Sequence, residues 1–471
     1  MNNRGGRELE VVALDSPNNS PQNPEWTVTA LSLIFAALWS ITSLPHTLGI
    51  QYACLVMGAI LGLYVVKKNS KAFANRSYIP LLLIGFLFLW LIFHLFFIGQ
   101  NYKLQLQELG VIWKRAFLGS LFAVGLGISV VNSENTRINW SILLVGLAFP
   151  TVIFYVKYFS AFVLPLLGLD VPPWLVLYRE PAEFYVPKIS YVFFCIPCLA
   201  VSIGVIVSDL ENKSLHLKSF ALLTLLVVSI LGLFYLENIK NGIAYGALII
   251  GFGILKILMM KRTHILPKLL ILLSCAVILV VFSVKNIEQN ESWRSFYSDL
   301  KVALSIDPFD PQGYILSGNY PINERGVEVQ PANYARFTWG IAAIHLIRDN
   351  PLGYGVAHSS FGHLVKQRFP ETSLAQSHSG WLDMILGLGI PGAGLVLLAS
   401  ILAIKNAMDL SPPWKNFGVW FLGSMVLLWI TTEVSQKNYL NTFIWMIVLV
   451  ASLSIGMATQ SKAISAHLRK K

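Results

Sequence analysis

Residues 79–98 read IPLLLIGFLFLWLIFHLFFI and contain no Asp, Glu, Lys or Arg. As an α-helix this stretch would be about 30 Å long, which is the thickness of the hydrocarbon core of a bilayer. Runs of the same kind recur at about 27–45, 48–66, 116–132, 139–158, 189–208, 219–236, 242–260, 267–284, 380–404, 416–434 and 439–458. We therefore expect an all-α polytopic membrane protein with about 12 transmembrane helices.

The composition of the whole chain supports this expectation. Of its 471 residues, 55% are hydrophobic and only 13% are charged, whereas soluble domains carry about 25% charged residues. The net charge of +11 is spread between the apolar runs and forms no single patch. Such a distribution indicates orientation in the membrane and contact with anionic lipids, and it does not favour nucleic acid as a partner.

Basic residues in the short connections predict the orientation. They follow the second run (Lys67, Lys68, Lys71, Arg76), flank the end of the eighth (Lys256, Lys261, Arg262, Lys268) and close the chain (Lys462, Arg469, Lys470, Lys471). All three groups face one side if both termini are cytoplasmic. The expected layout is a disordered tail at 1–25, nine spans within 26–284 with an outer loop at about 159–188, a large outer loop at 285–378, three spans within 379–458, and a basic tail at 459–471.

The large outer loop is too long for a simple turn and should be partly helical. We expect helices at about 291–305, 334–348 and 360–369. The intervening residues 306–332 are rich in proline and glycine and should form turns. Asn333 is expected to cap the second helix, which would place Arg336 in its first turn, where a cation favours a nearby anion.

Four short motifs lie between this loop and the tenth apolar run. They are RFTW at 336–339, NPLGYG at 350–355, HSGWL at 378–382 and GLGIPG at 387–392. Their order and spacing resemble the O-antigen ligase and polymerase superfamily, and the layout is most similar to its ligase (WaaL) branch. Three positions depart from the family pattern: Ser379 replaces a usual Asn, Gly387 replaces a common acidic residue, and Lys240-Asn-Gly replaces Ser-Arg-Gly.

The resemblance implies a glycosyltransferase of the bacterial inner membrane with its active site on the periplasmic side. Its donor would be a glycan linked to undecaprenyl diphosphate, and its acceptor would be a sugar hydroxyl of the lipid A–core oligosaccharide. Transfer would be an inverting single displacement that needs no cofactor. An O-antigen polymerase or an O-linking oligosaccharyltransferase remains an alternative within the superfamily, and a lipid or glycan transporter remains an alternative from another class.

The same residues can be interpreted from their chemistry. His378 lies where a polar loop meets the membrane, so it is either a histidine at a helix end or a general base, because a neutral imidazole can accept a hydroxyl proton near pH 7. Four cations at outward-facing positions are either solvated or bind a diphosphate. They are Arg336, Lys240, Arg179 and Lys188. Asp383 and Glu433 are acidic residues that could orient His378.

No metal site is evident in the sequence. His345, His358 and His363 lack the spacing of zinc ligands, and no carboxylate pair stands out in an outer loop. A phosphate-binding loop of the Gly-x-x-x-x-Gly-Lys-Ser/Thr kind is also absent. We therefore expect a reaction that depends on neither a metal ion nor nucleotide hydrolysis.

Overall fold

The computed structural model describes residues 24–70, 73, 76–177, 183–214, 216–260, 273, 284, 294–309, 319–431 and 437–468. The regular secondary structure of these residues is helical, with no β-strand among them. Ten of the helices among them are long and apolar enough to cross a membrane, which fits a multi-pass membrane protein. They are α1 (Glu25–Thr42), α2 (Leu48–Lys68), α3 (Ile79–Phe97), α4 to α5 (Tyr102–Val131), α6 (Thr136–Leu166), α7 (Lys188–Asn212), α8 (Leu217–Leu236), α9 (Lys240–Met259), α16 (Gly380–Ala407) and α19 (Lys437–Leu468).

The sequence predicts about twelve spans, two more than the described part of the chain contains. The run at 267–284 lies outside the described residues except for its positions 273 and 284. The run at 416–434 forms a short continuous helix from α17 (Trp414–Asn416) through η5 (Phe417–Phe421) to α18 (Leu422–Leu428). The helical membrane architecture is thus confirmed, and the number twelve stays a prediction.

The fourth span begins earlier than its apolar run. It comprises α4 (Tyr102–Glu108), the π-helical turn η3 (Leu109–Trp113) and α5 (Lys114–Val131). Arg115 lies within it and is buried, with its guanidinium donating to Asn438 Oδ1 at 2.5 Å and to Gln51 Oε1. Because α2 and α19 supply these polar partners inside the protein, the helix tolerates a charge that would be costly against lipid.

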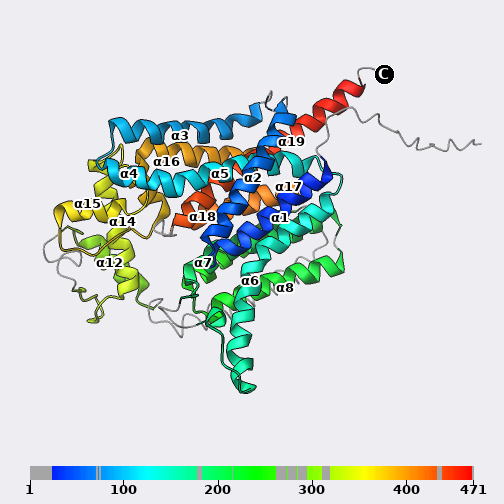
Figure 1. The fold of residues 1–471 in the computed structure, drawn as a ribbon. Helices are drawn as coiled ribbons and strands as arrows, with labels where there is room; N and C mark the ends of the chain where they lie inside the picture. Colours follow the sequence, from blue (N-terminus) through cyan, green and yellow to red (C-terminus); the bar gives the residue numbers. More distant parts are fainter. Residues whose placement is uncertain are drawn as a thin grey trace, which may run out of the picture.

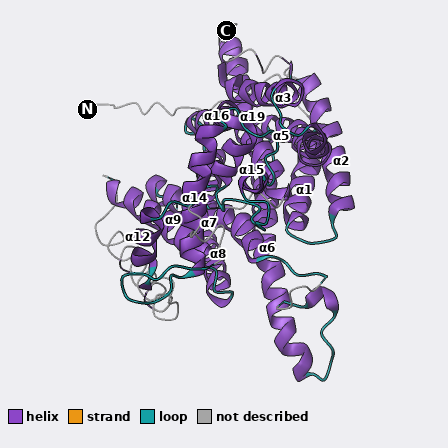
Figure 2. Ribbon diagram, turned by 90° about the vertical axis from the view of Figure 1, so that its left-hand side faces the viewer, coloured by secondary structure: helices purple, strands orange, loops and turns teal. Residues whose placement is uncertain are grey.

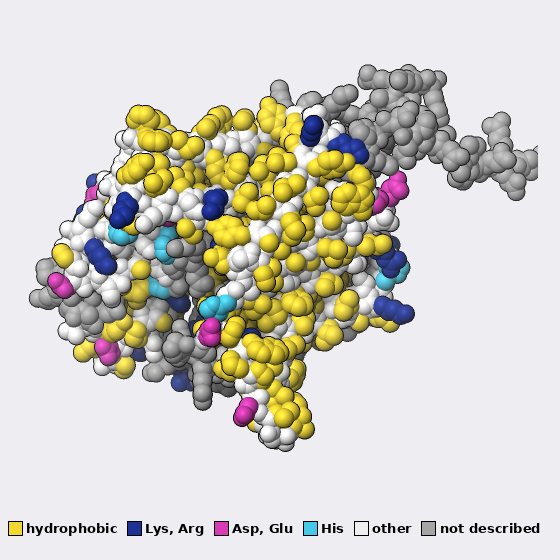
Figure 3. Space-filling model, in the orientation of Figure 1, with side chains coloured by type: hydrophobic (Ala, Val, Ile, Leu, Met, Phe, Trp, Pro, Cys, Tyr) yellow, Lys and Arg dark blue, Asp and Glu magenta, His cyan; other side chains and the backbone are white. Residues whose placement is uncertain are grey.

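The membrane helices lie side by side, with a second group of helices at one end (Figure 1). Of the ten spans, α19 and α7 are the most enclosed. Hydrophobic side chains cover a broad band of the body in Figure 3. The extramembrane helices α12 (Phe296–Ser305), α14 (Pro331–Asp349) and α15 (Ser360–Arg368) gather at the end of the bundle opposite the C-terminus of α19. These three helices place the candidate site at that end.

A buried carboxylate ties α12 to α14. Asp299 is fully buried and accepts hydrogen bonds from Ser295 Oγ at 2.6 Å and Asn333 Nδ2 at 3.1 Å. The expected capping role of Asn333 is therefore wrong, because α14 already begins at Pro331 and the Asn333 side chain points to Asp299. Arg336 consequently lies in the second turn of α14. The predicted effect of the helix N-terminus on Arg336 is also wrong, because such effects fade beyond the first turn.

Helix α6 forms an arm that leaves the body. The sequence predicts a span at 139–158, but the helix continues without interruption to Leu166. Its last part projects from the bundle in both views (Figures 1 and 2). The chain then returns through the 3₁₀ turn η4 (Pro173–Leu175) toward α7.

Candidate active site

Helix α16 is broken at Gly389, inside the membrane-spanning segment. Gly389 has φ 72° and ψ 173°, and Pro391 follows it. The break exposes backbone groups that a loop from outside the span then binds. Tyr354 N donates to Leu386 O at 2.7 Å, Gly355 N donates to Gly387 O at 2.7 Å, and Ile390 N donates to Pro351 O at 2.9 Å. Irregular backbone at membrane depth requires such internal partners.

We call residues 350–358 the brace, since they hold the broken part of α16. The brace and the helix pack so closely that only glycine fits at several positions. A Cβ on Gly353 would lie 2.3 Å from Gly389 N, and a Cβ on Gly387 would lie 2.5 Å from Ala357 Cα. The glycine at 387, where the related family often has an acid, is therefore a backbone packing contact in this chain.

Glu108 holds the other end of the brace. Its carboxylate accepts hydrogen bonds from Ala357 N at 2.9 Å, from His358 N at 2.8 Å and from Trp113 Nε1 at 2.9 Å. The side chain is buried in the fourth span, directly before a π-helical turn. Three donors compensate for the burial of this acid.

Two further membrane residues bind the same region. His94 Nε2 lies 2.8 Å from Leu352 O, and its Nδ1 lies 2.9 Å from Gln105 Nε2. Trp90 Nε1 donates to Leu388 O at 2.8 Å. Sequence reasoning assigned these three residues no role, because no motif surrounds any of them. His94 and Trp90 stand in an apolar run, and Glu108 lies in the polar stretch between two runs.

His378 is fixed at the start of α16 in a left-handed conformation, with φ 60°. Such a conformation is uncommon outside glycine and is often associated with function. On one side of it, Ser377 N donates to Asp383 Oδ1 at 2.9 Å; on the other, Ser379 caps the helix by accepting from Leu382 N. Asp383 therefore holds the backbone next to His378.

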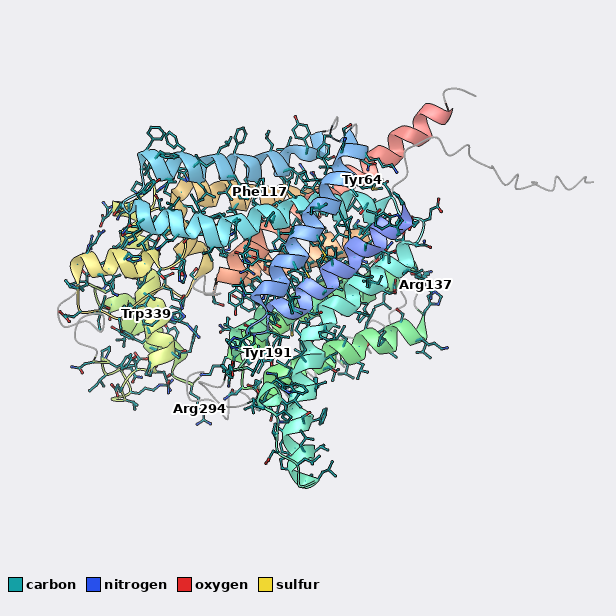
Figure 4. The ribbon with its side chains drawn as sticks, in the orientation of Figure 1. Tyr64, Phe117, Arg137, Tyr191, Arg294 and Trp339 are labelled. Carbon is teal, nitrogen blue, oxygen red and sulfur yellow. The ribbon has the colours of Figure 1, made fainter. Side chains whose placement is uncertain are left out.

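The imidazole of His378 stacks on Trp339, with ring centroids 4.8 Å apart and planes at 15°. Trp339 comes from α14, in the extramembrane group (Figure 4). Arg336 is one turn earlier on the same helix, so both side chains leave the same face. Arg336 also lies close enough to Lys240 and Tyr245, both in α9, to act electrostatically on them. The structure thus brings His378, Arg336 and Lys240 to one end of the bundle.

Lys188 lies beside this group but already has a partner. Its Nζ donates to Glu237 O at 2.6 Å and lies 3.9 Å from the Glu237 carboxylate. Glu237 ends α8, three residues before Lys240. We call Lys188, Lys240 and Arg336 the cation rim. The remaining candidates, Arg179 and Glu433, lie outside the described residues.

The cation rim suits an anion better than a neutral ligand. Arg336 and Lys240 carry like charges within electrostatic range of each other, and a phosphate near both would relieve their repulsion. In the described part of the chain, no three His, Cys, Asp or Glu residues lie together as metal ligands. Independence from metal stays a prediction.

The comparison with protein families concerns this same region. Residues 225–397 match a family model described as O-antigen ligase. The matched segment runs from α8 into α16, past the break at Gly389, and includes Lys240, Arg336, His378 and Asp383. It supports the O-antigen ligase and polymerase superfamily, a group of glycosyltransferases, without distinguishing the ligase from the polymerase. The chain matched none of the curated proteins with which it was compared.

Proposed function

We propose that this chain is an O-antigen ligase-type glycosyltransferase, which moves O-antigen glycan from undecaprenyl diphosphate to a sugar hydroxyl of the lipid A–core oligosaccharide. The observation that carries the proposal is the stacking of His378 on Trp339, one helical turn from Arg336, whose charge acts on Lys240. A base and an anion site then lie together at the end of a membrane bundle, within the segment that matches the O-antigen ligase model.

The proposed reaction is one displacement. His378 removes the proton from the acceptor hydroxyl, and that oxygen forms a bond to the anomeric carbon of the donor sugar. The bond between this carbon and the diphosphate oxygen breaks, and its electron pair leaves with the diphosphate. Arg336 and Lys240 stabilise the charge that develops on the leaving group. The anomeric configuration inverts, and neither a metal ion nor a cofactor takes part.

The neighbouring residues mainly position the groups that react. Asp383 acts through Ser377 N, and Trp339 holds the plane of the imidazole by stacking on it. Lys188 contributes positive potential at the edge of the site. Arg179 as a further diphosphate ligand and Glu433 as an orienting acid remain proposals that rest on the sequence.

The proposed orientation places this site in the periplasm and both termini in the cytoplasm. Lys67 and Lys68 end α2, and Lys256 stands in the last turn of α9, whereas Lys240 at the other end of α9 belongs to the site. A Ser373→Cys variant, at an exposed position after α15, should react in intact cells with a thiol reagent that cannot cross the inner membrane. Reaction only after that membrane is opened would reverse the orientation.

One experiment tests the function against its alternatives. The gene is deleted in its host, and lipopolysaccharide and lipid-linked glycan are analysed separately. Long glycan accumulating on the lipid carrier, with core oligosaccharide left bare, is expected for a ligase. Single repeat units on the carrier would instead indicate a polymerase, and unmodified glycoprotein with normal lipopolysaccharide would indicate an oligosaccharyltransferase. Lipid-linked glycan confined to the cytoplasmic leaflet would indicate a transporter.

A further inference from the structure

A groove of about 350 Å³ opens on the lipid-facing side of the bundle, between the α1–α2 turn and α6. Its walls are mainly apolar, with Leu44 and Pro45 on one side, Val152 and Val156 on the other, and Trp174 from the returning chain. Val152 and Val156 are each 49% exposed, so the groove is open toward the surface that faces lipid. Its volume is at the lower end of the range for ligand sites, about 300–1,000 Å³.

One cation lies in this apolar wall. Lys157 is only 5% exposed, and its Nζ donates to Phe184 O at 2.8 Å. Across the described residues, the ion pairs of the structure include none for Lys157. A lysine inside the membrane-spanning part of a protein is costly and usually marks a functional contact. An apolar groove with an ammonium at one point fits a long-chain lipid that carries an anionic head.

One residue that lines the groove is close in the sequence to a residue of the cation rim. Phe184, which binds Lys157, is four residues before Lys188, so these two positions are at most about 14 Å apart. Lys188 in turn binds Glu237, at the turn that leads to Lys240. Two hydrogen bonds and two short stretches of chain therefore link the groove to the proposed diphosphate site.

The α6 arm extends this wall beyond Lys157. Phe159, Phe162 and Leu166 are all more than half exposed, and the arm is covered with hydrophobic side chains in Figure 3. Apolar side chains in this number are stable in lipid and not in water. The arm therefore places the groove within the lipid layer, at the end of the bundle where the cation rim lies.

We propose that this groove binds part of the polyprenyl chain of the lipid-linked donor, and that Lys157 is the first cation its phosphates meet on the way to Lys188, Lys240 and Arg336. The inference rests on the proposed function for the identity of the lipid. It adds a binding site made by the α1–α2 turn, α6 and the chain that returns toward α7, all of which lie outside the segment that matches the O-antigen ligase model.

The test compares a long and a short isoprenoid. Binding of undecaprenyl diphosphate and of farnesyl diphosphate is measured with the full-length protein in nanodiscs. Val152→Trp and Val156→Trp each fill the groove and should lower the preference for the long chain at least about tenfold, while farnesyl diphosphate binding changes little. Val145→Trp is the matched control, because Val145 is 63% exposed on the same helix and does not line the groove. An unchanged preference in both groove variants overturns the proposal.

A second variant tests the cation. Lys157→Met keeps an unbranched side chain of similar size and removes its charge, and it should weaken the binding of both diphosphates by a similar factor of about three to ten. Lys366→Met, at an exposed position on α15, is the control and should bind both as the wild type does. Undiminished binding in Lys157→Met removes Lys157 from the path. Glycan transfer by the wild-type protein is assayed separately, so that loss of the proposed function and loss of the groove give different results.

Discussion

The brace and the cation rim lie next to each other but are built in opposite ways. Residues 353–357 of the brace are buried, Gly353 fits against the backbone of α16, and the hydrogen bonds of the brace reach α3, α4 and α16. In the cation rim, by contrast, Arg336 and Lys188 are exposed and Lys240 is half-buried. The difference teaches that this chain fixes the geometry of the site with buried backbone contacts and one buried carboxylate, and keeps Arg336 and Lys188 at the surface. Substitutions in the brace should therefore lower stability and turnover, whereas substitutions in the cation rim should lower donor binding.

The largest effect is expected for His378→Ala. Loss of a general base should slow transfer by about 10²–10⁴-fold, while donor binding and thermal unfolding stay near wild type. The assay uses purified protein, lipid-linked glycan and acceptor, with donor binding measured separately. A folded variant that transfers at close to the normal rate would remove His378 from the role of base.

Arg336→Ala should reduce both donor binding and rate, by about ten- to a hundredfold, as expected for a lost charge-assisted hydrogen bond of about 1.5–3 kcal/mol. Arg336→Lys should recover only part of the loss, because the point charge is kept and the planar fork is not. Equilibrium binding of the lipid-linked donor gives the measurement. Arg348→Ala, at an exposed position in the last turn of α14, is the control. Unchanged affinity in Arg336→Ala would contradict a diphosphate site there.

Glu108→Gln tests the brace. The amide presents a donor to one of the two backbone N–H groups that the carboxylate now binds, so about 2–3 kcal/mol of stability should be lost. Thermal unfolding in a fixed detergent measures this change, and kcat should fall with it while donor affinity stays. The matched control is Glu134→Gln, at an exposed position between α5 and α6. A stable Glu108→Gln protein with normal turnover would show that the brace does not depend on this acid.

The smallest expected effect is on the stability of the folded protein at acidic pH. His363, in α15, stacks on Tyr354 of the brace, with ring centroids 5.4 Å apart. Burial, with a smaller effect of Lys366, lowers the pKa of His363 below its usual 6.5. The neutral ring is then favoured in the folded protein. The stability it contributes is full above pH 6.5 and is lost as pH falls through the lower folded pKa.

His363→Asn should reduce this acid sensitivity. The unfolding temperature of the wild type should fall slightly more between pH 7 and pH 5 than that of the variant. The exposed His345, in α14, provides the control variant His345→Asn. Parallel pH curves for wild type and His363→Asn would exclude the linkage.

Much of the fold was predictable because membrane spans depend on local apolar runs. The helices expected at 334–348 and 360–369 correspond to α14 and α15. The fourth span was misplaced because Glu108 and Arg115 interrupt its apolar pattern, and their partners come from elsewhere in the fold. The first turn of α14 was also misplaced, since Pro331 begins the helix ahead of Asn333.

The sequence predicts the motifs of the site but not the contacts between them. The sequence indicates that 350–355 and 387–392 matter, but not that they bind each other through backbone atoms. The hydrogen bonds of Glu108 to Ala357 and His358 join positions 249 and 250 residues apart, a separation that no local pattern reveals. The neighbourhood of Arg336 and Lys240 depends in the same way on how α9 and α14 approach each other.

The break at Gly389 also has a consequence for biogenesis. Before its break, α16 has two carbonyl groups, those of Leu386 and Gly387, that accept hydrogen bonds from the brace, and the ribosome makes the brace before it makes α16. A newly inserted α16 alone in lipid would leave those carbonyls without donors, at a cost of several kcal/mol each. We infer that α16 is completed only when the loop already made docks onto it. Membrane insertion and assembly of the extramembrane helices become a single step for this part of the chain.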